Sequence, residues 1–110
     1  MPNTDNSLNI SVTFRHTDSS DSLKKHTNDK LIHCLNKYIK KHADVRAVLS
    51  VEKKDHLAEI YIVSKDFEAK VSAVTKNLYT AIDKVVHKLD IQLRKQKKKH
   101  VEFKHASVPV

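Results

Sequence analysis

Lysine side chains recur on one face of a helix predicted near the C-terminus, where they could bind phosphate groups. At the helical period of about 3.6 residues, this stripe consists of Lys84, Lys88, Lys95 and Lys98. Residues 76–100 contain eight basic residues and two acidic ones, and both acids, Asp83 and Asp90, fall on the other flank of the helix. A line of ammonium groups with no acid in it is typical of a surface that follows nucleic-acid phosphates.

A second line of basic side chains falls on a helix predicted to follow Ser20. It consists of His26, Lys30, His33, Lys37 and Lys40, at spacings of three and four residues. One such stripe is commonly ordinary solvated surface. Two stripes of one sign on partner helices favour phosphate binding instead, and they would border one basic surface if the helices pack side by side.

Eight histidines and one cysteine raise the alternatives of a metal site or a catalytic nucleophile. His26 and His33 share a helix face but lie about two turns apart, and no set of ligands has the spacing of a zinc site. Cys34 falls in an apolar helix stripe, where a free cysteine is usually a small hydrophobic residue. The chain has no glycine, which excludes Gly-rich phosphate loops. Because the carboxylates are also scattered, we expect no metal, no cofactor and no enzymatic activity.

The bulk composition is that of one small basic domain. The 110 residues are 39% apolar and 31% charged, with a formal net charge of +8 at pH 7. This excess favours a polyanionic partner, although charge alone does not choose between RNA, DNA and an anionic membrane. A single cysteine, a polar N-terminus and the lack of a long apolar run favour a cytoplasmic protein. Most of the six Phe and Tyr residues fall on predicted core faces, which favours recognition through shape and backbone contacts over base stacking.

Alternating apolar and polar residues predict four strands. They fall at residues 8–14, 45–52, 56–63 and 67–73. Short polar turns separate the last three strands, which indicates an antiparallel meander. Apolar residues at spacings of three and four predict two helices, one capped by Ser20 and ending near residues 41–42, the other capped by Thr75 and ending near residue 98.

The predicted fold is therefore α+β in the order β-α-β-β-β-α, with two helices packed on one face of a four-stranded sheet. The α-β-β-β-α part is also the layout of double-stranded-RNA-binding domains, here preceded by a strand, and this comparison is an analogy of fold. We expect a single domain over residues 8–98, between a flexible N-terminus at residues 1–7 and a flexible tail at residues 99–110.

Two segments of the chain resemble the ribosome hibernation promoting factors and ribosome-associated inhibitors (protein Y). The weaker match is the strand Leu49-Ser50-Val51-Glu52-Lys53. The more specific match is the last helix, with Leu78-Tyr79-Thr80-Ala81-Ile82-Asp83, then Lys88-Leu89-Asp90 and Gln92-Leu93. The order of elements agrees over residues 8–98, which is nearly the whole predicted domain.

This resemblance implies a factor that binds the small ribosomal subunit where mRNA and the A- and P-site tRNAs would lie. Family members act by occluding that channel, without catalysis or a cofactor. Short members favour the pairing of ribosomes into inactive dimers, and members with a longer acidic tail oppose it. The basic positions of the family correspond here to Lys24, Lys30, Lys88, Lys95 and Lys97. Its signature tyrosine corresponds to Tyr79, for which packing beside the core is the alternative role.

The sequence departs from the family pattern in two places. Ile91 stands where arginine is common and interrupts the lysine stripe, so one phosphate contact is in doubt. Lys65-Asp66 replaces a glycine pair between the last two strands, which requires a different turn. The residues after Lys98 are few and have Glu102 as their only acid, which resembles the dimer-promoting members.

The resulting hypothesis is a monomeric translation-silencing factor whose two helices bind the small ribosomal subunit and its rRNA, and neither DNA nor a membrane. The predicted phosphate contacts are Lys30, Lys37, Lys84, Lys88, Lys95 and Lys98. Two alternatives are a general RNA-binding module with no preference for ribosomes, and a protein-interaction adaptor whose lysines serve solubility.

Overall fold

Six elements follow one another in the order predicted from the sequence. The computed structural model describes residues 8–39, 42–65 and 67–107, with only the backbone described at 98–107. The elements are β1 (Leu8–Arg15), α1 (Asp21–Leu35), β2 (Ala43–Glu52), β3 (Asp55–Ser64), β4 (Glu68–Thr75) and α2 (Leu78–Ser107). The predicted flexible N-terminus at residues 1–7, and residues 108–110 of the predicted tail, lie outside the described residues.

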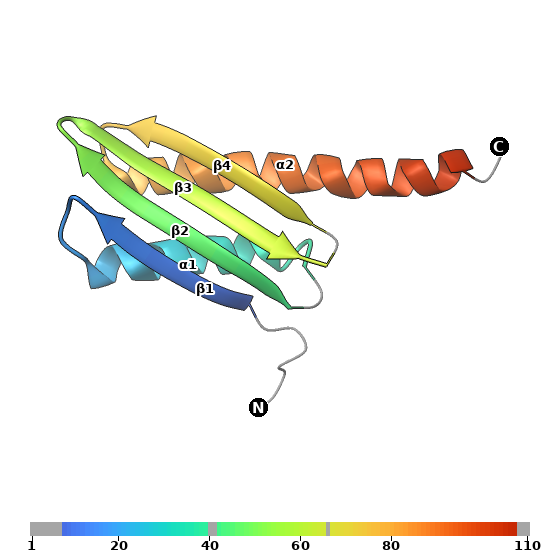
Figure 1. Cartoon of the computed structure of the whole chain (residues 1–110), viewed down its shortest axis with the longest axis horizontal. Coiled ribbons are helices and arrows are strands. Elements are labelled where there is room, and N and C mark those ends of the chain that lie inside the picture. Colours follow the sequence, from blue (N-terminus) through green and yellow to red (C-terminus); the bar gives the residue numbers. More distant parts are fainter. Residues whose placement is uncertain (1–7, 40–41, 66, 108–110) are drawn as a thin grey trace, which may run out of the picture.

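The four strands form one mixed sheet in the order β1-β2-β3-β4 (Figure 1). The pairs β2–β3 and β3–β4 are antiparallel, which confirms the predicted meander. β1 pairs with β2 in parallel, with Leu8 beside Ala43. A parallel pair needs a long crossover connection, and α1 provides it. As a consequence β1, β2 and β4 run in one direction, so α1 and α2 both begin at the same end of the sheet.

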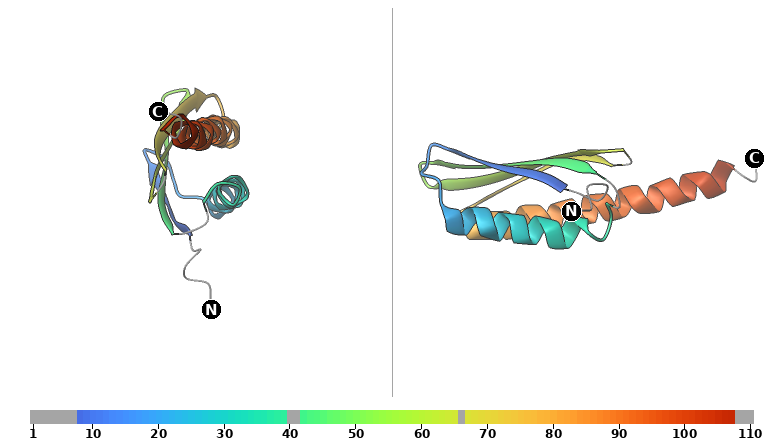
Figure 2. Two further views of the ribbon diagram at one scale, coloured as in Figure 1. Left: turned by 90° about the vertical axis from the view of Figure 1, so that its right-hand side faces the viewer. Right: turned by 90° about the horizontal axis from the view of Figure 1, so that it is seen from below.

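Both helices pack on one face of the sheet, as predicted (Figure 2). The apolar stripe of α2 is buried along its whole predicted length, at Leu78, Ile82, Val85, Leu89 and Leu93. Much of the opposing sheet face consists of alanine, at Ala43, Ala47, Ala58, Ala69 and Ala73. Small side chains on the strands leave room for the leucine and isoleucine side chains of the helices, so the two layers fill a common core.

The start of α1 is confirmed and its end is corrected. Ser20 is the N-cap, since its side-chain oxygen accepts a hydrogen bond from the backbone N–H of Leu23. The helix ends at Leu35 instead of continuing to residues 41–42. The next residues form tight turns in which the N–H groups of Tyr38 and Ile39 both donate to the Leu35 carbonyl. These turns bury Ile39 in the core and redirect the chain toward the start of β2.

Both predicted ends of α2 are corrected. The cap is Asn77, whose side-chain oxygen accepts hydrogen bonds from the N–H groups of Tyr79 and Thr80, while Thr75 bonds to Asn77 itself. The helix continues to Ser107, beyond the end predicted near residue 98. The sequence explains this extension, because residues 98–107 contain neither glycine nor proline and Pro109 is the first helix breaker.

The chain makes its tight turns without glycine. Lys53, in the two-residue turn between β2 and β3, has φ of 60°, a left-handed conformation that costs a residue with a Cβ about 1–2 kcal/mol. In the connection between β3 and β4, the Ser64 N–H donates to the Phe67 carbonyl, and the Ser64 hydroxyl oxygen accepts from the Phe67 N–H. These bonds close the connection in place of the glycine pair common in the family.

Core packing along α2 yields a test with a matched control on the same helix. Leu89 is fully buried and Ile91 is 37% exposed. Leu89→Ala should lower the free energy of unfolding by about 2–5 kcal/mol, because it leaves a cavity in the core. Ile91→Ala should lower it by less than about 1 kcal/mol. Urea denaturation measures both values, and equal losses would contradict the assigned face of α2.

Candidate nucleic-acid interface

The predicted lysine stripe of α2 lies on the flank that borders β4. Lys84, Lys88 and Lys95 are all exposed there. The Lys88 ammonium donates a hydrogen bond of 2.9 Å to the backbone carbonyl of Ser72 in β4, which fixes its direction without neutralising its charge. The side chain of Lys98 lies outside the described residues. This flank therefore presents a short row of cations beside the edge of the sheet.

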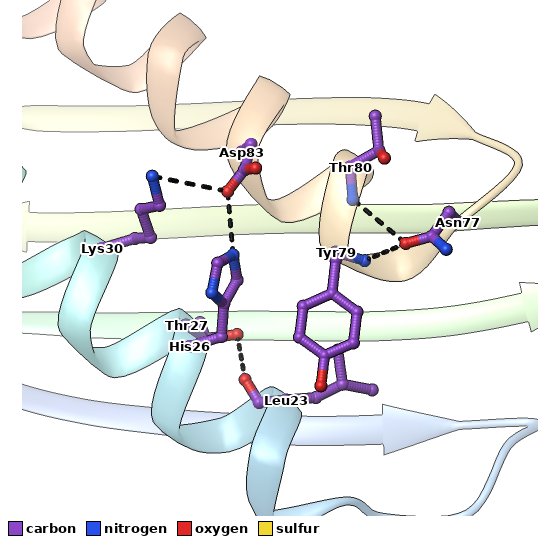
Figure 3. A network of polar contacts seen from close by, with 8 residues as sticks. All are labelled: Leu23, His26, Thr27, Lys30, Asn77, Tyr79, Thr80 and Asp83. Atoms are coloured by element: carbon purple, nitrogen blue, oxygen red, sulfur yellow. Dashed lines mark hydrogen bonds and ion pairs between the residues drawn. The ribbon is translucent and has the colours of Figure 1, made fainter.

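The other predicted basic stripe has a different environment, because His26 and Lys30 of α1, and Lys37 in the turn after it, face two acids of α2. Figure 3 shows the first of these acids, Asp83, with His26 and Lys30. His26 Nε2 lies 2.8 Å from Asp83 Oδ1, a hydrogen bond in which the ring N–H donates. The Lys30 ammonium lies 3.7 Å from the same carboxylate oxygen. The first acid of α2 is thus shared by two cations of α1.

Asp90, seven residues further along α2, has the larger set of partners. Its carboxylate forms ion pairs with Lys37 at 2.9 Å and Arg94 at 3.0 Å, and it accepts a 2.8 Å hydrogen bond from the Tyr38 hydroxyl. The side chain is only 13% exposed. The hydrogen bond from Lys37 lowers the pKa of Asp90 most, and Tyr38 and Arg94 contribute, although burial opposes the shift. Asp90 therefore stays ionised and holds the C-terminal half of α1 against α2.

Cys34 is buried beside this carboxylate and is not an activated thiol. Burial first, and then the negative charge of Asp90, raise the pKa of this thiol to about 11. A thiol with such a pKa is protonated at neutral pH and is a poor nucleophile. Among the described residues, no three histidine, cysteine or carboxylate side chains lie together so that they could hold a metal ion. In the same part of the chain, neither helix is long and apolar enough to cross a membrane.

The two basic stripes are consequently separated by acids and do not form one uninterrupted surface. Lys30 and Lys37, both predicted phosphate contacts, already have carboxylate partners. The exposed predicted lysines that form no ion pair with another described residue are Lys24, Lys84, Lys88, Lys95 and Lys97. Most of the uncompensated positive charge among the predicted contacts therefore lies on α2.

Tyr79 stands in the first turn of α2 and is 43% exposed. Its ring lies edge-to-face with the His26 ring, with centroids 5.1 Å apart and planes at 68°. Figure 3 shows the tyrosine reaching from α2 toward Leu23 of α1. The side chain thus contacts the neighbouring helix and still presents much of its surface to solvent.

A comparison with protein families finds one whose model matches most of the chain. Residues 10–101 match the model of the family described as Sigma 54 modulation protein / S30EA ribosomal protein. The chain belongs to this family. The match covers every helix and strand, apart from the first two residues of β1 and the last turns of α2.

Named members of the S30EA family are similar to this chain over most of their length. A ribosome hibernation promoting factor of Azotobacter vinelandii is 26% identical over 102 residues, which cover 93% of this chain and 94% of that protein. One of Pseudomonas putida is 26% identical over 92 residues, covering 84% and 89%. The N-terminal domain of protein Y from Thermus thermophilus superposes with a TM-score of 0.72 at 26% identity, covering 79% and 97%. A ribosomal subunit interface protein from Coxiella burnetii, at 22% identity, has the same fold with a TM-score of 0.72.

The acids of the helix interface are the residues that sequence reasoning underestimated. Asp83 and Asp90 were placed correctly on the flank away from the lysine stripe, but their role as partners of α1 was not predicted. A signal existed, because Lys30 and Lys37 are seven residues apart and so are the two acids. Residues seven apart on a helix share a face, so two side-by-side helices with this spacing can form two ion pairs.

Asp90 should make stability depend on pH. A carboxyl group whose pKa is lowered in the folded state contributes stability above the unfolded pKa of about 3.9, and the contribution is lost as pH falls through the folded value. At pH 7, Asp90→Asn should lower the free energy of unfolding by about 1–2 kcal/mol, because the variant loses the charge that binds Lys37 and Arg94. The difference from wild type should shrink below about pH 4.

Urea denaturation at pH 7, 5 and 3 measures this dependence. Asp29→Asn is the matched control, because Asp29 forms only an exposed pair with Lys25 on α1 and its loss should cost under about 0.5 kcal/mol. A destabilisation by Asp90→Asn that stayed constant down to pH 3 would contradict the electrostatic role.

Proposed function

We propose that this protein is a ribosome hibernation factor that binds the small ribosomal subunit in the channel otherwise occupied by mRNA and by the A- and P-site tRNAs. Membership in the S30EA family, with relatives named ribosome hibernation promoting factors, supports a ribosomal partner. The observation that carries the proposal is the row formed by Lys84, Lys88 and Lys95, which is exposed and contains no acid. Occlusion of a channel needs affinity and shape, and neither catalysis nor a cofactor.

The predicted lysine contacts differ in how readily they can bind phosphate, because only some of them already form ion pairs. Lys84, Lys88 and Lys95 can bind phosphate without first losing a carboxylate partner. Lys30 and Lys37 must first lose their ion pairs with Asp83 and Asp90. The free energy of breaking these pairs offsets part of the free energy of binding phosphate. We therefore assign the main electrostatic contact to the unpaired lysines, which are Lys97 and the row on α2 together with Lys24 on α1, and a smaller contribution to Lys30 and Lys37.

The length of α2 supports binding inside a channel. At about 1.5 Å per residue its 30 residues span about 45 Å, whereas the longest strand, of ten residues, spans about 33 Å. The C-terminal part of α2 accordingly extends past the sheet (Figure 1). Lys97, Lys98, Lys99 and Lys104 belong to this segment in the sequence. A rigid basic helix that projects from the domain can follow a groove in rRNA that the wider sheet could not enter.

We also assign the protein to the members that favour pairing of inactive ribosomes. The support is the composition of residues 99–110, among which Glu102 is the only acid. An acidic segment at this place would repel rRNA phosphates.

Co-sedimentation with separated ribosomal subunits tests the proposed site. The protein should pellet with the small subunit and not with the large one. Saturating the small subunit with mRNA and initiator tRNA should release it, because the ligands compete for one channel. Equal binding to any RNA would leave the general RNA-binding alternative, and binding to neither subunit nor RNA would leave the adaptor.

Replacing α2 lysines should change the salt dependence of binding to the small subunit. Each phosphate contact contributes a slope of about −0.7 to −0.9 to a plot of log affinity against log salt. The variant Lys84→Gln/Lys95→Gln/Lys97→Gln should bind at least about tenfold more weakly at low salt, with a slope smaller by about 2–3. Filter binding over a range of potassium chloride concentrations measures both quantities.

The matched control removes the same number of charges from outside the two helices. Lys54 and Lys65 lie in the turns between strands, and Lys70 lies on the sheet face away from the helices, over the Tyr61 ring. Their triple replacement by glutamine should leave the slope nearly unchanged. An equal effect of the two triple variants would show that only net charge matters and would sink the assignment to α2.

A further inference from the structure

Tyr79 combines exposure with a fixed position, which is unusual for the aromatic residues of this chain. Among the phenylalanine and tyrosine residues whose side chains the structure describes, it is the most exposed, at 43%. Phe14, Phe67, Tyr38 and Tyr61 are all half-buried. Where side chains are described, Tyr79 is therefore the exposed phenylalanine or tyrosine ring of the two helices.

Three interactions fix the position of this ring, two made by Tyr79 and one made by its neighbour His26. Asn77 caps α2 and accepts a 2.8 Å hydrogen bond from the Tyr79 N–H, which fixes the backbone. The His26 ring packs against the tyrosine ring at 5.1 Å. His26 is itself held by its 2.8 Å hydrogen bond to Asp83 (Figure 3). A side chain that is already ordered loses little conformational entropy when a ligand binds to it.

The adjoining helix α1 carries two lysines in the turns that lie nearest the ring. Lys24 follows Leu23, the residue beside the tyrosine in Figure 3, and forms no ion pair with a described residue. Lys30 lies one turn further along α1 and shares Asp83 with His26. The topology of the sheet brings these groups together, because both helices begin at the same end of it. An aromatic face beside ammonium groups is the combination that binds unpaired nucleotides, through stacking of the base and neutralisation of its phosphate.

We propose that Tyr79, supported by His26, is a stacking site for one unpaired nucleobase of the RNA. The site rests on the proposed function, since it assumes that RNA binds the helix face, and it adds a mode of contact that phosphates alone do not supply. Stacking tolerates any base, so the site distinguishes unpaired from paired nucleotides and not one sequence from another. It also revises the expectation, drawn from composition, that this face has no stacking platform.

Substitution of the ring tests the site. Tyr79→Leu keeps an apolar side chain against Leu23 and His26 but removes the aromatic face, whereas Tyr79→Phe keeps the face and removes only the hydroxyl. Tyr79→Leu should bind the small ribosomal subunit, and a short oligoadenylate at low salt, about five- to a hundredfold more weakly than wild type. Tyr79→Phe should bind within about twofold. The salt slope should be the same for all three proteins, because no phosphate contact is lost.

An abasic strand of the same length separates stacking from other causes. It keeps the phosphates and lacks the bases, so wild type and Tyr79→Leu should bind it equally. A wild-type experiment needs no substitution: oligoadenylate with one 2-aminopurine should change its fluorescence on binding, as a stacked base does. Thermal unfolding of each variant verifies that the fold is retained.

The results of these experiments distinguish the stacking site from the proposed ribosomal function. Wild-type binding with no loss in Tyr79→Leu, an equal loss on the abasic strand, or unchanged 2-aminopurine fluorescence would overturn the stacking site and leave the ribosomal function standing. Failure of wild type to bind the small subunit and oligoadenylate at low salt would overturn both.

Discussion

Two carboxylates on α2 determine how the helix layer is held together and where its positive charge is exposed. Asp83 and Asp90 are spaced seven residues apart and meet two lysines with the same spacing, Lys30 on α1 and Lys37 in the turn that follows it. The pairs bring two basic helices side by side, which like charges alone would drive apart. The same pairs occupy Lys30 and Lys37, so the lysines on the opposite flank of α2 keep their full charge for a ligand.

The free-energy cost of removing the carboxylate from water differs between Asp83 and Asp90. Asp83 is half exposed, so water stabilises its charge and the contacts to His26 and Lys30 add little to stability. Asp90 is nearly buried, and its desolvation is offset only because Lys37, Arg94 and Tyr38 all direct polar hydrogens at it. The contacts near Tyr79 thus orient side chains at the surface, whereas those of Asp90 join the two elements beside the core.

The sequence predicted what depends on periodicity and missed what depends on packing between elements. The apolar stripe of α2, the Ser20 cap and the antiparallel meander follow from local spacing and are confirmed. The parallel placement of β1 was not predictable from local pattern, because it depends on where α1 returns the chain. The end of α1 at Leu35 also escaped local reasoning, since Tyr38 and Ile39 continue the helical period although the chain has already turned. The partners of the lysines belong to the same class, because an exposed lysine and a paired lysine look alike in a sequence.

The arrangement of charge and ring on the helix face bears on how an RNA ligand would be selected. Phosphate contacts depend on the path of the nucleic-acid backbone, and both a duplex and an unpaired strand present phosphates. A rigid aromatic ring responds only to bases whose faces are free. Tyr79 lies at the end of the helix layer where α1 contributes Lys24, while the row of Lys84, Lys88 and Lys95 lies along the flank beside β4. A ligand that contacts both must place phosphates along α2 and an unpaired base near the N-terminus of α2, and this geometric demand excludes most regular duplexes.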